Sequence, residues 1–102
     1  MFLGNTFSPM MLAPGVKAKV EEYPIEDIPV SDCTSVVGHE VTAKILSALL
    51  RTEIPYNRVS VKLAVGDILF AVIPNFRASE AREFTYEEVK SAGFRSFKIE
   101  TY

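Results

Sequence analysis

The run from Ser35 to Arg51 constrains the fold of this chain more than any other segment. Its apolar residues recur at three- and four-residue spacing, as on one face of an α-helix; they are Val37, Val41, Ile45, Leu46 and Leu49. Pro55 cannot continue the backbone hydrogen-bond ladder, so we expect the helix to end in the segment 52–55. The sequence therefore predicts one long amphipathic helix that covers a sheet.

Strands are predicted on both sides of this helix, and in the segment 16–23 apolar and polar residues alternate as in a half-buried strand. The expected strands are 1–7, 16–23, 58–65, 68–73 and 96–101. The Gly66-Asp67 pair predicts a hairpin between the third and fourth of these strands. Thr85 and Glu88 have the spacing of a capping box, which predicts a short helix closed by Gly93. We expect a single α+β domain over residues 1–102 with a mixed or antiparallel sheet.

Composition limits the size and the setting of this domain. The chain has 102 residues and is 48% hydrophobic, which supports one folded core with apolar surface left over for a second subunit. We therefore expect a homodimer. The single cysteine, Cys33, cannot form an intrachain disulfide and is interpreted as a small apolar residue of an intracellular protein. The start of the sequence, MFLGNTF, lacks the pattern of a signal peptide, and no apolar run predicts a membrane span.

Charge argues against general nucleic-acid binding. Eleven Lys and Arg against thirteen Asp and Glu give a formal net charge of −2, whereas proteins that follow a DNA or RNA backbone usually present a basic stripe. A small anionic ligand remains compatible with this charge, because two or three well-placed arginines can bind it.

The only histidine, His39, is the candidate for acid-base chemistry. A lone histidine is more often a packing or surface residue. One His and one Cys cannot supply a tetrahedral zinc site, and the sequence has neither a calcium-loop pattern, a glycine-rich phosphate loop nor a serine-hydrolase elbow. Metal-free acid-base work by His39 is what remains.

We expect His39 in the first turn of the long helix, on a face shared with Thr42, Ala43 and Leu46. The backbone N–H groups of a helix start favour anions, so a phosphate ester can lie over this turn. Bound phosphates would keep the imidazole protonated and able to give a proton to a leaving 5′-oxygen.

Three blocks of this sequence resemble one family, the small viral ring nucleases that act as anti-CRISPR proteins by destroying cyclic tetra-adenylate. The strongest block is SVVGHEVTAKILSALLRTEIPYNRVSVKL, with a hydrophobic-Gly-His helix start, an amphipathic helix and an Asn-Arg-Val strand entry. GNTFSPMML is similar to the family's Asn-x-Phe-Ser-x-x-Met-Leu segment. In the weaker third block, Arg77 is followed three residues later by Glu80. The resemblance covers nearly the whole chain.

The resemblance implies a homodimer that binds one ring, in which each ribose 2′-OH attacks its neighbouring phosphodiester without a metal or cofactor. It implies His39 as general acid, with Glu80 orienting groups or relaying protons at the same site. It further implies that Arg58 and Arg77 hold phosphates, that Asn5 and Ser8 hydrogen-bond phosphate or ribose, and that Thr42 lines the pocket. The products would be linear di-adenylates with a 2′,3′-cyclic phosphate. The protein would act in the cytoplasm of an infected or lysogenic prokaryotic host.

The sequence departs from the family's pattern around the arginine loop. The family has Gln before the loop arginine and Gly after the glutamate, whereas this chain has Phe76 and Ala81. Either Asn75 takes the role of the glutamine or Phe76 stacks on adenine. Two other functions stay open: a dimer that sequesters the ring without cutting it, and a small viral structural or adaptor protein.

Overall fold

Five strands form one mixed sheet in the computed structural model, which describes residues 1–102. They are β1 (Phe2–Gly4), β2 (Ala18–Glu22), β3 (Thr34–Ser35), β4 (Ile68–Pro74) and β5 (Phe94–Thr101). Their order across the sheet is β2-β5-β4-β1-β3; β1 runs parallel to β3 and β4, and the other pairs are antiparallel. Two α-helices, α1 (Glu40–Leu50) and α2 (Tyr86–Ala92), complete the α+β domain, together with the short 3₁₀ turns η1 (Pro9–Met11), η2 (Ile25–Asp27) and η3 (Val30–Asp32).

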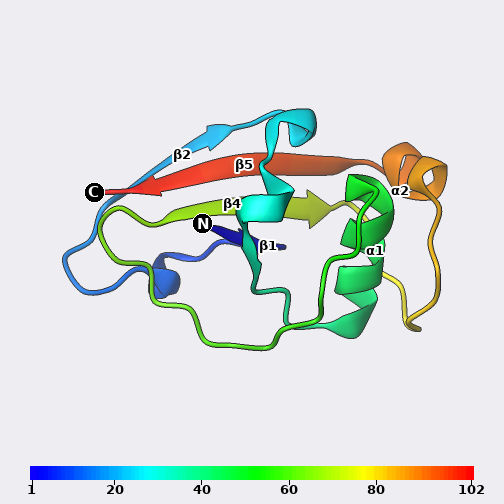
Figure 1. Ribbon diagram of the computed structural model, residues 1–102, viewed down its shortest axis with the longest axis horizontal. Helices are drawn as coiled ribbons and strands as arrows, with labels where there is room; N and C mark the ends of the chain where they lie inside the picture. The colour runs from blue at the N-terminus through cyan, green and yellow to red at the C-terminus, as the bar shows by residue number, and fades with distance from the viewer.

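The helices pack on one face of the sheet, at the end to which the β4 arrow points, whereas the C-terminus lies at the other end (Figure 1). The main core lies between sheet and helices: α1 contributes the buried Ile45, Leu46 and Leu49, and the sheet contributes Leu3 and Phe70. A smaller core covers the opposite face. None of the helices is long and apolar enough to cross a membrane.

The predicted hairpin is wrong. Residues 58–65 form no strand, and only Leu63 makes an isolated bridge, to Leu12. Both edges of β4 are already occupied by β1 and β5, so no edge is left for this segment. The Gly66-Asp67 turn does form, because the amide of Ala64 donates to Asp67 Oδ2 at 2.8 Å. This turn leads the chain into β4. Leu63, just before the turn, is completely buried in the smaller core against Leu69 and Ile99.

The two helices follow the sequence pattern more closely. The helix α2 begins at the predicted capping box of Thr85 and Glu88 and ends at Gly93, which has a φ of 92°. The helix α1 begins later than predicted, at Glu40, because Ser35 belongs to β3 and the amide of Val36 donates to the carbonyl of Leu3 at 2.9 Å. The first strand is likewise shorter than predicted, since it ends at Gly4.

Candidate functional site

The site is built where the parallel strands β1 and β4 end. Because parallel strands point the same way, the residues that follow them meet at one edge of the sheet, which is where open α/β sheets commonly bind ligands. Asn5 follows β1, the loop 75–84 follows β4, and α1 starts beside them. Residues far apart in the sequence therefore line a common hollow.

This hollow, here called the Arg77 cavity, has a volume of about 490 Å³. Its polar lining residues are Asn5, His39, Thr42 and Arg77. The apolar part of its wall comes from α1, β4 and the start of the loop: Val41, Ile45, Ile73, Pro74, Phe76 and Ala78. One imidazole and one guanidinium among neutral hydrogen-bonding groups suit an anion better than a cation.

A second hollow, the Arg58 cavity, lies on the other side of His39. It has a volume of about 320 Å³, and Asn5 and His39 line it as well as the first. Gly38 stands here against Arg58, whose Cγ lies 3.6 Å from where a Cβ on residue 38 would be. His39 thus stands between two cavities that each contain one arginine. Neither guanidinium is engaged in an ion pair or hydrogen bond within the chain.

His39 is the N-cap residue of α1 and not part of its first turn. Its backbone is extended, with φ −133° and ψ 131°, and its side chain makes no capping hydrogen bond. Thr42 lines the same cavity as His39, but Ala43 and Leu46 are buried in the core, so the predicted shared face is wrong for those two residues. The exposed imidazole and the unpaired first-turn N–H groups of α1 both remain available to a ligand.

Two of the predicted residues lie outside both cavities. Ser8 caps η1, where its Oγ accepts from the amide of Met10 at 3.3 Å. Glu80 is exposed on the loop 75–84 and lines neither hollow. The geometry therefore brings Asn5, His39, Thr42, Arg58 and Arg77 together and leaves Ser8 and Glu80 aside.

The departure from the family's loop pattern also has a structural position. Phe76 lines the Arg77 cavity and packs edge-on against Phe84, with ring centroids 6.0 Å apart. Asn75 lines neither cavity, and its side-chain Nδ2 donates to the carbonyl of Ala92 at 3.4 Å. Of the two predicted substitutes for the family's glutamine, only Phe76 faces the cavity.

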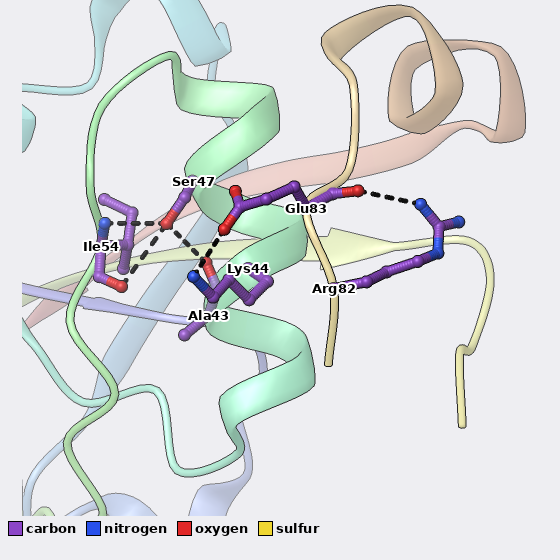
Figure 2. A network of polar contacts seen from close by, with 6 residues as sticks. All are labelled: Ala43, Lys44, Ser47, Ile54, Arg82 and Glu83. Atoms are coloured by element: carbon purple, nitrogen blue, oxygen red, sulfur yellow. Dashed lines mark hydrogen bonds and ion pairs between the residues drawn. The ribbon is translucent and has the colours of Figure 1, made fainter. Parts of the chain in front are cut away.

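The contacts that hold the loop 75–84 could not be predicted from local sequence patterns. Lys44 Nζ on α1 donates to Glu83 Oε1 at 2.8 Å, a pair separated by 39 positions (Figure 2). This hydrogen bond raises the pKa of Lys44. Arg82 donates to the carbonyl of Glu83 at 3.0 Å and forms an ion pair with Glu88, which lowers the pKa of that carboxyl. The arginine loop is thus tied to both helices.

A larger cavity, about 890 Å³, lies elsewhere, beside β3 and the segment 52–57. Two of its polar side chains are engaged within the chain: Ser35 Oγ donates to the carbonyl of Pro55 at 2.7 Å, and Asn57 Nδ2 donates to the carbonyl of Ser35 at 2.6 Å. Cys33 lines this cavity, and burial raises the pKa of its thiol. We place the candidate site at His39 and not in this larger cavity, because the only imidazole of the chain and two unpaired guanidinium groups lie there.

The fold and the site together define a small α+β protein that places one histidine and two unpaired arginines at the edge where its parallel strands end. The chain belongs to the STIV B116-like family, whose sequence pattern matches residues 1–96. It is similar to solved B116 of Sulfolobus turreted icosahedral virus, with a TM-score of 0.80 and 22% identity over 97% of each chain. This likeness establishes the fold.

Relatives of the chain come from archaeal viruses. It is 39% identical over 71 residues to uncharacterized protein 26 of Sulfolobus islandicus filamentous virus (isolate Iceland/Hveragerdi), which covers 67% of this chain. The matched region spans 60% of that relative's length. It is 30% identical over 107 residues to uncharacterized protein ORF116 of Acidianus filamentous virus 1 (isolate United States/Yellowstone), covering 99% of this chain and 90% of the relative. The viral origin that the resemblance implied is supported by these relatives.

Proposed function

We propose that this protein is a metal-independent ring nuclease that cleaves cyclic tetra-adenylate. The observation that carries the proposal is the position of His39 between two cavities that each present one uncommitted arginine. A proton donor flanked by two anion-binding groups suits a phosphodiester backbone that passes over the start of α1. The resemblance of the sequence blocks around Asn5 and His39 to viral ring nucleases supplies the substrate.

The proposed reaction needs no group beyond the ring and the chain. The ribose 2′-OH attacks the adjacent phosphorus and loses its proton to solvent, while the bond from phosphorus to the 5′-oxygen breaks. The His39 imidazolium gives its proton to that departing oxygen. Arg58 and Arg77 offset the charge that develops on the phosphate. The products are a 2′,3′-cyclic phosphate and a 5′-hydroxyl. Because Glu80 lines neither cavity, we assign the general-acid step to His39 alone.

A homodimer completes the proposed site. The Arg77 cavity of about 490 Å³ is in the size range of a pocket for one small molecule. A ring of four nucleotides needs more surface, and the two-fold symmetry of a dimer presents one His39 to each of two opposite corners of the ring. Cleavage at both corners gives two linear di-adenylates. In the cytoplasm of an infected prokaryote this removes the second messenger of type III CRISPR defence.

A second candidate function is a dimer that sequesters the ring without cutting it. The position of Glu80 outside both cavities favours this alternative, because no second acid-base group then stands beside His39.

Incubation of the protein with cyclic tri-, tetra- and hexa-adenylate, each with and without EDTA, tests the proposal. We expect loss of the tetra-adenylate ring at the same rate with and without chelator. A ring with 2′-deoxyribose at every position is the matched control, because it binds through its phosphates and has no internal nucleophile. Binding without any cleavage would establish sequestration, and the absence of binding would refute both functions.

A further inference from the structure

The outer edge of β2 is an unpaired strand edge. This strand ends the sheet on the side opposite to β3, and its partner is β5 (Figure 1). Lys17 and Tyr102 exchange both backbone hydrogen bonds at 2.9 Å, which fixes the alternation along the pair. The N–H and C=O groups of Ala18, Val20 and Glu22 therefore point away from β5. Val20, at the centre of this edge, is 49% exposed.

Charged residues beside Val20 form a pattern of alternating sign. Lys19 lies opposite Glu100 of β5, and Glu21 lies opposite Lys98. Lys98 Nζ and Glu100 Oε1 are 2.8 Å apart. The hydrogen bond with Glu100 is the main cause that raises the pKa of Lys98, and Glu21 adds to it. These four residues thus form one interacting patch that ends at the open edge.

We propose that the β2 edge pairs with β2 of a second copy of this chain, antiparallel and with Val20 opposite Val20. In this register Lys19 of each copy lies opposite Glu21 of the other. Reading across the four strands, Lys98, Glu21, Lys19 of the second copy and Glu100 of the second copy alternate in sign. Opposite charges directly across a strand pair are stabilising.

Backbone geometry supports the same register. Val20 opposite Val20, and Ala18 opposite Glu22, become hydrogen-bonded pairs that satisfy the outward-pointing groups. Lys19 and Glu21 of the other copy then form non-hydrogen-bonded pairs, in which side chains approach most closely. Because β2 has only five residues, the interface is small, and we expect concentration-dependent association and not a permanent complex.

This contact is independent of the proposed function. The β2 edge is separated from β1, which leads to Asn5, by β5 and β4. Pairing there leaves both arginine cavities open. The β2 pairing joins the sheets of two copies into one. It is a second contact, separate from the one by which two copies would enclose a ring.

Light scattering across a concentration series tests the pairing. At millimolar concentration the wild-type chain is expected to reach at least twice the mass of a Val20→Pro variant, because proline is tolerated on an edge strand but removes the outward N–H donor. Circular dichroism of the variant confirms that the sheet is intact. Equal masses of the two folded proteins at every concentration would overturn the proposal.

Charge complementation gives a second, independent readout. Lys19→Glu and Glu21→Lys should each abolish pairing through the β2 edge, because like charges then face one another across it. An equimolar mixture of these two variants should associate again, since the acidic edge of one meets the basic edge of the other. Lys62→Glu mixed with Glu87→Lys is the matched control, with the same charge changes at exposed positions outside β2. Failure of the edge mixture to associate more than this control would refute the register.

Discussion

Removal of the Arg77 guanidinium should weaken binding of cyclic tetra-adenylate by a large and calculable factor. The side chain is exposed, lines the cavity beside His39 and has no ion pair to lose. A hydrogen bond to a charged group contributes about 1.5–3 kcal/mol. One ring held between two copies loses two such contacts, about 3–6 kcal/mol, which corresponds to roughly 10²–10⁴ in Kd. Arg58→Ala, in the second cavity, is expected to have an effect of the same size.

Arg82→Ala is the matched control for this prediction. Arg82 lies on the same loop, but its guanidinium is already occupied by the carbonyl of Glu83 and the carboxylate of Glu88. Titration calorimetry in a His39→Ala background, at matched salt, keeps the ring intact during the measurement. We expect a loss of affinity for Arg77→Ala well beyond that for Arg82→Ala. If Arg77→Ala in this background binds the ring as tightly as His39→Ala alone, Arg77 is a solvated surface charge and does not hold a phosphate.

Three further predictions concern stability, pH and assembly. Ser47→Ala should lower the free energy of unfolding by about 0.5–2.5 kcal/mol in urea denaturation, because the amide of Ile54 loses its acceptor at 2.9 Å while alanine gains helix propensity; an unchanged midpoint contradicts this. Arg82 lowers the pKa of Glu88 below its ordinary value of 4.5, so the carboxylate stabilises the fold above that pH and the effect is lost as pH falls through the lowered pKa. The protection factor of the Val89 amide, which corrects the exchange rate for the intrinsic rate at each pH, should therefore fall on acidification in the wild-type chain, whereas in Glu88→Gln it should be lower at neutral pH and change less. Calorimetry should give one ring per two chains, and one ring per chain would contradict the shared site.

Local signals predicted the helices because their information lies within a few residues. Thr85 and Glu88 specify the start of α2 by themselves. The apolar spacing of α1 likewise fixes its buried face, including Ile45 and Leu49. The position of His39 as N-cap was missed because β3 holds the preceding residues extended, and β3 exists only by pairing with β1.

The failed hairpin has a similar cause. The segment 58–65 alternates as a strand does, and Leu63 is buried as that alternation requires. The neighbours of β4 in the sheet are β1 and β5, and neither is adjacent to β4 in the sequence. Local alternation in the segment 58–65 therefore could not show that both edges of β4 are occupied. Among the cavity residues, His39 and Thr42 could be predicted from the helix start, whereas Asn5, Arg58 and Arg77 were predicted through resemblance to a family. The link from Lys44 to Glu83 across 39 positions had no local signal at all.

Single-turnover cleavage of cyclic tetra-adenylate in EDTA, by the wild-type chain and by His39→Ala, tests the central claim most directly. With protein in excess over ring, the measured rate reports the chemical step alone. A positioned general acid contributes about 10²–10⁴-fold, so the variant should be slower by that factor and still bind the ring. Wild-type and variant rates that agree would contradict the account and remove His39 from the mechanism.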